Sequence, residues 1–309
     1  MKSNHSVKFQ RIDEASISVR EFFRMFPDDE TCLRHVFENR FGEGHICPKC
    51  NRSAKWYRIE AERAYCCQWC GHHIHPTVGT PFEQTRTPLQ LWFYAIYLFT
   101  TSRHGVSAKE LERQLGVTYK TAWRMGHEIR KHMAQVDGDR PLNSPVEVDE
   151  TYIGGVRPGK RGRGAAGKTI LMGMLRRDGD IVTEVVGDVK KPTLQAHIEN
   201  HVADGATVNT DELFSYQGLN GKGYNHQTVN HSKGQHVDGE IHVNGVESFW
   251  KHFKASVKGT HIHVSGKHLA KYAKEFEFRY NNRRIPKQMF PRLVSEFLSC
   301  HCGPCEKAS

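Results

Sequence analysis

The sequence predicts an α/β fold in which a mixed sheet with flanking helices fills the second half of the chain. A small cysteine-rich ribbon and a helical region precede it. Three observations predict this: two Cys-x-x-Cys pairs, helical apolar spacing over residues 88–135, and strand-like runs that alternate with helical ones over residues 146–298. We expect five segments in chain order: a helical lead-in (1–30), the ribbon (31–85), the helical region (86–140), the α/β domain (141–298) and a polar tail (299–309).

The composition is that of a soluble globular protein with more than one domain. The chain has 309 residues, of which 38% are hydrophobic and 25% are charged. Its formal net charge of +10 favours a polyanionic partner, most often nucleic acid, although a basic soluble enzyme also fits. No run reaches the roughly 18 apolar residues of a membrane span, and residues 1–8 lack the apolar core of a secretory signal. We therefore expect a cytoplasmic protein without a membrane partner.

The nine cysteines favour metal binding over disulfides, because no secretory signal is present. Cys47 and Cys50 form one C-x2-C pair, and Cys67 and Cys70 form a second pair sixteen residues later. Two such pairs can enclose one zinc ion in four thiolates, which leaves no open coordination position. We therefore predict a structural Zn2+, with Cys66 as a competing ligand that the spacing disfavours. A looser group is interpreted as part of a disordered tail, with a metal site as the alternative: Cys300, Cys302 and Cys305.

Residues 107–130 predict two helices joined by a tight turn. Ser107 with Glu110 forms a capping box, Gly116 suits a helix C-terminus, and Thr118 suits the next N-cap. This arrangement is typical of a helix-turn-helix, whose second helix enters the major groove. A helical hairpin that only packs a core is the alternative. The predicted DNA-contacting residues lie at the start of the second helix: Thr118, Tyr119, Lys120, Thr121 and Arg124.

Two apolar runs of the α/β domain end in aspartates. The first predicts a strand that ends at Asp149 and Glu150, and the second predicts a strand that ends at Asp211. Glu247 begins an amphipathic helical stretch. Two acids at strand ends and one on a helix can hold a pair of divalent cations such as Mg2+. In phosphodiester cleavage, one such ion activates the attacking oxygen and the other stabilises the leaving oxygen.

The elements between these acids predict the topology of the sheet. Residues 169–175 and 180–186 predict a hairpin, and residues 193–201 predict a helix. The resulting order is strand-strand-strand-helix-strand-helix-strand-helix. This is the order of a ribonuclease H-like sheet, in which metal ligands lie on the first and fourth strands and on a late helix. The predicted fold class is therefore a ribonuclease H-like mixed sheet.

The third metal ligand has two candidates. Asn244 lies three residues before Glu247, so both side chains can face the same side of a helix. A carboxylate is the better Mg2+ ligand, so we predict Glu247 with Asn244 as the alternative. Lys254 lies two helical turns after Glu247 and is predicted to contact phosphate near the cleaved bond. Three further acids are interpreted as surface residues or as residues behind the metal site: Glu150, Glu212 and Glu240.

Two further segments are rich in basic residues. Residues 154–168 are glycine-rich and carry five basic and no acidic residues, which predicts a loop that grips phosphates; a solvated surface loop is the alternative. Residues 272–284 alternate aromatic and basic residues, and predict a helix with its aromatics on the core and its lysines and arginines outward. The predicted phosphate contacts in the loop are Arg157, Lys160, Arg161 and Arg163.

Three segments resemble DDE-type transposases of bacterial insertion sequences: residues 146–155, residues 244–250 with Lys254, and residues 275–283. The match is to the subgroup with an N-terminal zinc ribbon, and it extends from residue 47 to about residue 298. The resemblance implies two Mg2+ or Mn2+ ions held by Asp149, Asp211 and a third residue that is Asn, Glu or His. It also implies recognition of terminal inverted repeats, with cleavage and strand transfer on double-stranded repeat and target DNA. Because two element ends must be paired, we expect a homodimer or higher oligomer on DNA, at the bacterial nucleoid.

Two other functions are compatible with parts of the sequence. In a DNA-binding regulator, the ribbon and the helix-turn-helix would act while the α/β domain only dimerises. The acids at strand ends and the basic loop disfavour this reading, because a regulator does not need clustered carboxylates near DNA. A host nuclease or repair enzyme of the same fold is the other alternative, and terminal repeats around the gene would distinguish a transposase from it.

Overall fold

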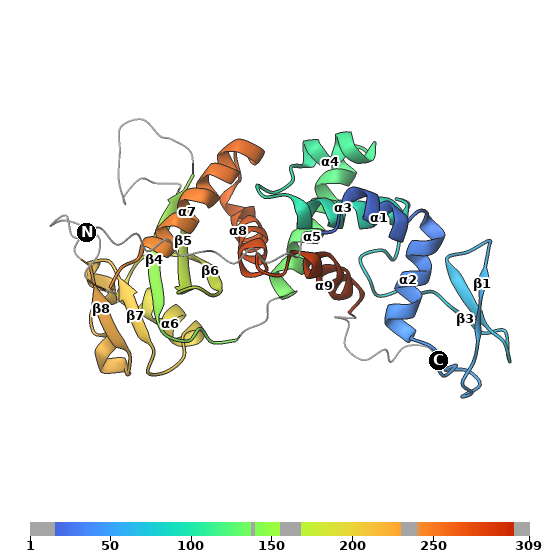
Figure 1. Cartoon of the computed structure of the whole chain (residues 1–309), viewed down its shortest axis with the longest axis horizontal. Helices are drawn as coiled ribbons and strands as arrows, with labels where there is room; N and C mark the ends of the chain where they lie inside the picture. Colours follow the sequence, from blue (N-terminus) through green and yellow to red (C-terminus); the bar gives the residue numbers. More distant parts are fainter. Residues whose placement is uncertain (1–15, 137–139, 155–167, 230–238, 240, 300–309) are drawn as a thin grey trace, which may run out of the picture. The chain divides into compact units, whose positions relative to one another are not determined.

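The computed structural model describes residues 16–136, 140–154, 168–229, 239 and 241–299 (Figure 1). The chain divides into two compact units. The first unit comprises residues 1–101 and 282–309, and the second comprises residues 102–281. The predicted helical region, residues 86–140, is thus divided between the units, and the last helix belongs with the N-terminal part. Among the described residues, no helix combines the length and the apolar character that crossing a membrane requires.

The first unit is built around an almost fully buried helix, α3 (Leu89–Thr101). Its residues Trp92, Phe93, Ile96 and Phe99 are fully buried. These residues lie on more than one side of the helix, because α3 packs against several neighbours. The other helices of this unit are α1 (Val19–Met25), α2 (Asp29–Phe41) and α9 (Pro286–Leu298).

A three-stranded antiparallel sheet, in the order β1-β2-β3, completes the first unit. Helix α2 packs on this sheet through Phe37, whose ring stacks on Tyr65 with centroids 4.3 Å apart. Two ion pairs join the start of α2 to the β1–β2 hairpin: Arg58 of β1 with Glu30, and Arg63 of the connecting turn with Asp29. The strands are β1 (Trp56–Ile59), β2 (Ala64–Cys67) and β3 (His73–Ile74).

The second unit contains a five-stranded mixed sheet in the order β6-β5-β4-β7-β8. Strands β4, β5 and β6 pair antiparallel, whereas β7 pairs parallel with β4 and with β8. The predicted α/β class and mixed sheet are confirmed. The strands are β4 (Val146–Ile153), β5 (Thr169–Arg176), β6 (Ile181–Val186), β7 (Thr207–Thr210) and β8 (Asn225–Thr228).

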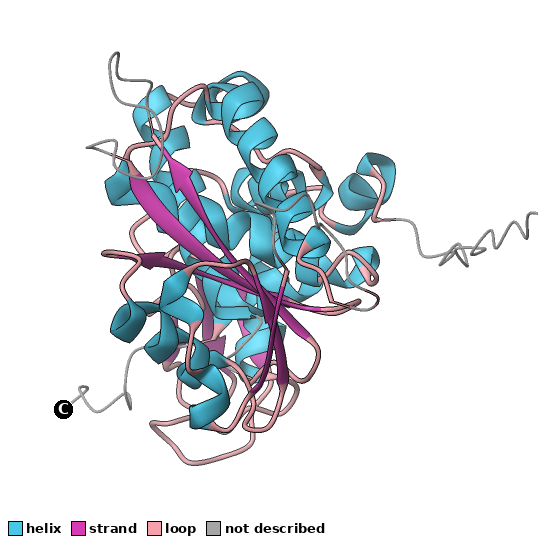
Figure 2. Ribbon diagram, turned by 90° about the vertical axis from the view of Figure 1, so that its left-hand side faces the viewer, coloured by secondary structure: helices cyan, strands magenta, loops and turns pink. Residues whose placement is uncertain are grey.

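Helices cover both faces of this sheet (Figure 2). Helix α6 (Lys191–His201) packs on one face, where Val146 and Val148 of β4 contribute to the core. Helices α7 (Asn244–Ser256) and α8 (Gly266–Asn281) pack on the other face. Side chains of β4 alternate between these faces, so Glu147, Asp149 and Thr151 share the face of α7.

Two sequence-based expectations about this sheet are wrong. Strand β4 does not end at Asp149 but continues to Ile153, because β5 pairs with it along its whole length. The helix expected between the fourth and fifth strands is replaced by two 3₁₀ turns, Phe214–Tyr216 and Leu219–Lys222. Glycines in left-handed conformation flank the second turn and prevent a longer helix from forming.

The predicted helix pair is present as α4 (Ala108–Leu115) and α5 (Tyr119–Val136). The Ser107 hydroxyl accepts the N–H of Glu110 at 3.1 Å, and Gly116 ends α4 with a φ of 64°. Thr118 caps α5 by accepting the N–H of Thr121 at 3.3 Å. Helix α5 has 18 residues and is therefore longer than the short second helix that we expected.

Helix α8 protects the edge of the sheet that is formed by β6. Its Glu277 carboxylate accepts the N–H and the hydroxyl of Thr183 in β6, and Asn281 exchanges two hydrogen bonds with the backbone of Ile181. An edge strand with unpaired N–H and C=O groups is a template for aggregation. These contacts occupy some of those groups on β6 and so make pairing with another chain less favourable.

A buried ion network joins α5 to α8. Glu275 lies 2.6 Å from Arg130 of α5 and 2.6 Å from Arg279 of its own helix, and the Glu275 side chain is 1% exposed. Arg130 also donates to the carbonyl of Val106 at 2.8 Å. The expectation that the arginines of this helix point outward is wrong for Arg279, because a buried carboxylate requires a charged partner.

Candidate metal centres

The first candidate centre is formed by the four cysteines of the ribbon. Their sulfur atoms all lie within 4.8 Å of one another. Cys47 Sγ is 3.6 Å from Cys70 Sγ, and Cys50 Sγ is 3.9 Å from Cys67 Sγ. Sulfurs about 2.3 Å from a tetrahedral zinc ion are separated by about 3.8 Å, so the arrangement fits Zn2+. Cys66, the competing ligand, lies outside this group.

Each cysteine pair is shaped by the same local hydrogen bonds. The carbonyl of Cys47 accepts the N–H of Asn51, and the carbonyl of Cys67 accepts the N–H of Gly71. Both Asn51 and Gly71 have positive φ, a conformation that Gly and Asn adopt most readily. Burial raises the pKa of the Cys47 thiol, but hydrogen bonds from the backbone N–H groups of residues 49 and 50 outweigh it. They lower this pKa to about 7, which favours the thiolate that zinc binds.

The packed core around these cysteines is very small. It consists of Cys47, Ala54 and Cys67, with Cys50, Trp56 and Cys70 at its margin. Such a core does not stabilise a ribbon by hydrophobic burial alone, so metal binding contributes to the folding free energy.

We expect Cys47→Ser to reduce the zinc content from about one ion per chain to near zero. The ribbon would then lose protection from proteolysis, because its small core does not hold it folded. The measurement is zinc released to a chromogenic chelator, combined with limited proteolysis. Cys66→Ser is the matched control and should retain zinc; full zinc content in Cys47→Ser would exclude Cys47 as a ligand.

The second candidate centre lies where β4 and β7 stop pairing. Their last paired residues are Glu147 and Asn209. Asp149 and Asp211 each follow two residues later, so they occupy equivalent positions on adjacent parallel strands. Such strands are about 4.8 Å apart, which places the two aspartates side by side beyond the last pairing. Asp211 directly follows β7, and its carboxylate accepts the N–H of Leu213 at 2.9 Å.

Electrostatic interactions link Asp149 to the other predicted acids. Burial first, and then the carboxylates of Glu150, Asp211 and Glu247, together raise the pKa of Asp149 to about 7. Like charges that oppose one another's ionisation favour a bound divalent cation, and carboxylate oxygens suit hard ions such as Mg2+. The site therefore fits Mg2+ by its chemistry, but no three of its acids place ligand oxygens within 4.8 Å of one another among the described residues.

Glu147 fixes the start of helix α7 beside this cluster. Its carboxylate accepts the N–H groups of Gly245 and Val246 at 2.7 and 3.1 Å. No side chain of α7's own N-cap residue does this, and a carboxylate at a helix N-terminus is also favoured by the helix dipole. Arg177 donates to the other oxygen at 3.2 Å. Glu147 thus holds the first turn of α7, which carries Asn244 and Glu247.

Two glycines allow α7 to approach the sheet closely. Gly173 of β5 lies directly opposite Asp149. A Cβ atom on Gly173 would lie 2.6 Å from the ring of Trp250, and one on Gly245 would lie 2.7 Å from Leu175 and 2.8 Å from Glu147. All three distances are shorter than those that real Cβ atoms show. The absence of side chains at these positions therefore brings the first turns of α7 close to the aspartates.

We expect Gly173→Ala to destabilise the protein by about 1–3 kcal/mol, because overpacking displaces buried side chains. Urea unfolding followed by tryptophan fluorescence measures this difference. Gly187→Ala is the matched control, since a Cβ atom there meets nothing within 4 Å. Equal stability of the two variants would show that α7 adjusts freely and is not held at this distance.

The structure places the remaining predicted residues as follows. Asn244, Glu247 and Lys254 are exposed along α7, and the predicted DNA-contacting residues of α5 are exposed except Thr121, which is partly exposed. Glu212 is exposed, whereas Glu150 is buried and accepts the hydroxyl of Tyr216 at 3.0 Å, so of its two interpretations the position behind the metal site fits and the surface position does not. The following residues lie outside the described part of the chain: Arg157, Lys160, Arg161, Arg163, Glu240, Cys300, Cys302 and Cys305.

Sequence reasoning missed Glu147, Gly173 and Tyr216. A signal for Glu147 was present, because polar residues 147, 149 and 151 recur with period two in an otherwise apolar strand and so share one face. No local signal marked Gly173 or Tyr216, whose roles depend on partners far away in the sequence.

Comparisons with known proteins identify two domains in the chain. Residues 141–281 match the ISXO2-like transposase domain, and residues 27–73 match the transposase zinc-ribbon domain. Over 293 residues the chain is 26% identical to an uncharacterized protein in transposable element ISH50 of Halobacterium salinarum. That alignment covers 88% of this chain and 98% of the relative.

A second relative is a shorter protein. Over 109 residues the chain is 31% identical to an uncharacterized transposase-like protein of Haemophilus influenzae. That alignment covers 35% of this chain and 87% of the relative. No solved structure matches the chain.

Proposed function

The chain belongs to the family of ISXO2-like transposases with a transposase zinc ribbon, and on this premise we propose that it cleaves and joins DNA at the ends of an insertion sequence. It binds the terminal inverted repeats and catalyses metal-dependent strand cleavage followed by strand transfer into target DNA. The observation that carries this proposal is the equivalent position of Asp149 and Asp211 on adjacent strands, with Glu247 close enough to affect the ionisation of Asp149.

The catalytic residues are proposed to be Asp149, Asp211 and Glu247, which would hold two Mg2+ or Mn2+ ions. When bound, such ions activate the attacking water or 3′-hydroxyl and stabilise the leaving oxygen. The contribution of Glu247 to the raised pKa of Asp149 supports it over Asn244 as the third ligand. Asn244 carries no charge and so would not raise the pKa of Asp149 even if it were the ligand. It therefore stays the alternative.

Other residues position this centre and the DNA. Glu147 holds α7 by its N-terminus and so keeps Glu247 beside the aspartates. Lys254, exposed on the same helix, neutralises a phosphate near the cleaved bond. The antiparallel β4, β5 and β6 followed by parallel β7 and β8 support a ribonuclease H-like fold for this domain.

The domains have separate tasks in this proposal. The ribbon, residues 31–85, is stabilised by zinc, the helical region, residues 86–140, contacts DNA, and residues 141–298 carry out catalysis. Pairing of two element ends requires a homodimer or higher oligomer on DNA, at the bacterial nucleoid. The basic residues of the 154–168 loop add phosphate contacts.

Helix α5 is proposed as the recognition helix of a helix-turn-helix. Its capped first turn, with Lys120 and Arg124 exposed, supports this role. We expect Lys120→Ala combined with Arg124→Ala to weaken binding to the terminal repeat by about 10- to 100-fold, with a smaller dependence on salt. Lys131→Ala, which removes another exposed cation of α5, is the control. Fluorescence anisotropy over a series of salt concentrations measures both quantities; unchanged affinity in the double variant would make α5 a structural helix.

The proposed function is tested with a labelled duplex that carries the element's own terminal repeat. We expect the wild type to cut at the repeat boundary in Mg2+ or Mn2+ and to leave a scrambled duplex intact. A second labelled target duplex detects strand transfer. Binding of the repeat without cutting under any metal condition would favour a DNA-binding regulator, and cutting without preference for the repeat would favour a nuclease.

A further inference from the structure

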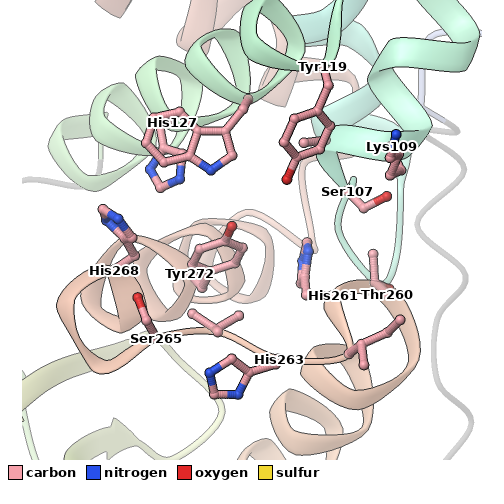
Figure 3. Close-up of a pocket in the computed structure, with 14 residues that line it drawn as sticks. Ser107, Lys109, Tyr119, His127, Thr260, His261, His263, Ser265, His268 and Tyr272 are labelled. Atoms are coloured by element: carbon pink, nitrogen blue, oxygen red, sulfur yellow. The ribbon is translucent and has the colours of Figure 1, made fainter.

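The second unit contains a cavity of about 330 Å³ next to the proposed recognition helix. One side of the cavity is formed by α5, and the other by α8 and the turn before it (Figure 3). From α5 come Tyr119, Trp123 and His127, which are spaced four residues apart and therefore share one face. His268 and Tyr272 of α8 line the cavity beside them, and the ring of His268 packs against that of His127.

Half of the residues that line this cavity carry aromatic rings. The rings of Trp123 and His127 have centroids 3.9 Å apart, and His268 lies 4.7 Å from His127 and 5.7 Å from Trp123. Aromatic surfaces of this kind stack with nucleobases regardless of their sequence. A volume near the lower end of the range for small-molecule sites, about 300–1,000 Å³, suits one planar base.

His127 provides a polar group without a partner inside this aromatic wall. It is 6% exposed, and neither ring nitrogen has a hydrogen-bond partner among the described residues. Burial lowers the pKa of His127 to about 4, and Arg130, His268 and Lys271 contribute, so the ring is neutral near pH 7. A neutral imidazole offers one donor and one acceptor, which matches the edge of a nucleobase.

The rim of the cavity carries a strained, exposed apolar residue. Ile262 is 86% exposed and has a φ of 64°, a left-handed conformation that is a clear outlier for a β-branched side chain. Strain of this kind persists mainly where function requires it. Apolar side chains such as isoleucine can enter a DNA stack as wedges between base steps.

We propose that this cavity receives one nucleobase that is unstacked from the bound DNA, and that Ile262 enters the stack beside it. The proposal rests on the proposed function, because the DNA must first lie along α5. Lys109 is close to the same rim, with its ammonium 5.0 Å from the ring centroid of Tyr119, and can neutralise a phosphate of the extruded nucleotide.

The distance from the catalytic acids limits where the unstacked base lies. Helix α7 leads from Glu247 to the turn at the cavity, and a helical path of that length spans about 20 Å. Bases along one strand are separated by about 3.4 Å, so we expect the unstacked base within about six positions of the cleaved bond.

The test uses terminal-repeat duplexes with a single mismatch placed in turn at each of these positions. A mismatched base is easier to unstack, so wild-type protein should bind one of these duplexes at least about tenfold more tightly than the paired duplex. Trp123→Ala and Ile262→Gly should lose this preference and still bind the paired duplex. Because glycine relieves the strain at residue 262, Ile262→Gly should also raise the melting temperature, which separates loss of function from loss of folding.

Phe214→Ala is the matched control, since Phe214 is a 71% exposed aromatic residue of the same unit that does not line the cavity. It should keep the mismatch preference. If the wild type binds and cuts the terminal repeat but shows no preferred mismatch position, or if the cavity variants keep the preference, this inference is overturned while the proposed function stands. Failure of the wild type to bind the terminal repeat at all would overturn both.

Discussion

Asp149→Asn is expected to reduce cleavage of the terminal-repeat duplex by about a thousandfold or more. Metal ions at a phosphoryl centre supply several kcal/mol of transition-state stabilisation, and each 1.4 kcal/mol corresponds to about tenfold in rate. Asparagine has the same shape as aspartate but lacks the charge that attracts a divalent cation. Binding of the repeat should be unchanged, because Asp149 lies in the sheet and not on α5.

The measurement is single-turnover cleavage in Mg2+ and in Mn2+, with binding followed separately by mobility shift. Asp204→Asn is the matched control, because Asp204 is an exposed aspartate of the same unit outside the cluster. Asp211→Asn should behave like Asp149→Asn. Near-normal cutting by either variant would show that the metal-holding residues have been assigned wrongly.

The same assay resolves the third ligand. If Glu247 holds a cation, Glu247→Gln should lose cleavage to a similar degree, whereas Asn244→Ala should keep most of it. The reverse result would assign the ligand to Asn244, which shares the first turn of α7. Glu147 of β4 holds that turn in place in both variants, so a loss of cleavage reports the missing ligand and not a displaced helix.

Arg130→Met is expected to destabilise the protein by about 3–5 kcal/mol. The substitution leaves the Glu275 carboxylate buried with Arg279 as its remaining ion-pair partner among the described residues, and it also removes a hydrogen bond to Val106. Methionine fills a similar volume, so the loss reports the buried charge and not a cavity. Urea unfolding at pH 7 measures the difference.

The pH dependence of this loss follows from Glu275. Burial alone would raise its pKa, but Arg130 and Arg279 outweigh burial and lower the pKa from 4.5 to about 2. A carboxylate with a depressed pKa in the folded state stabilises fully above its unfolded pKa and loses this contribution as the pH falls. The difference between wild type and Arg130→Met should therefore shrink as the pH decreases from about 4.5 towards 2.

Arg113→Met is the matched control for this ion network. Arg113 pairs with Glu110 on the surface of α4, with side chains that are 72% and 39% exposed. An exposed pair of this kind contributes about 1 kcal/mol or less. Comparable losses for Arg113→Met and Arg130→Met, or a loss for Arg130→Met that does not change below pH 4.5, would contradict a special role for the buried network.

Features that depend on local spacing can be predicted from the residues of a single segment. Two C-x2-C pairs predicted the cysteine group, because a knuckle is closed by hydrogen bonds within five residues. Ser107, Gly116 and Thr118 predicted the ends of α4 and α5, because caps act on the nearest turn. Apolar runs followed by Asp149 and Asp211 predicted the acids at the sheet, since the alternation of a strand is visible in its own residues.

Features that join distant residues depend on how the folded chain packs. Glu147 contacts Gly245 across 98 positions of sequence, and Arg130 contacts Glu275 across 145. The continuation of β4 beyond Asp149 depends on pairing with β5, and the burial of Glu150 depends on Tyr216. A buried charge or a bare glycine is stable only opposite a specific partner, and the identity of that partner is set by packing and not by spacing along the chain.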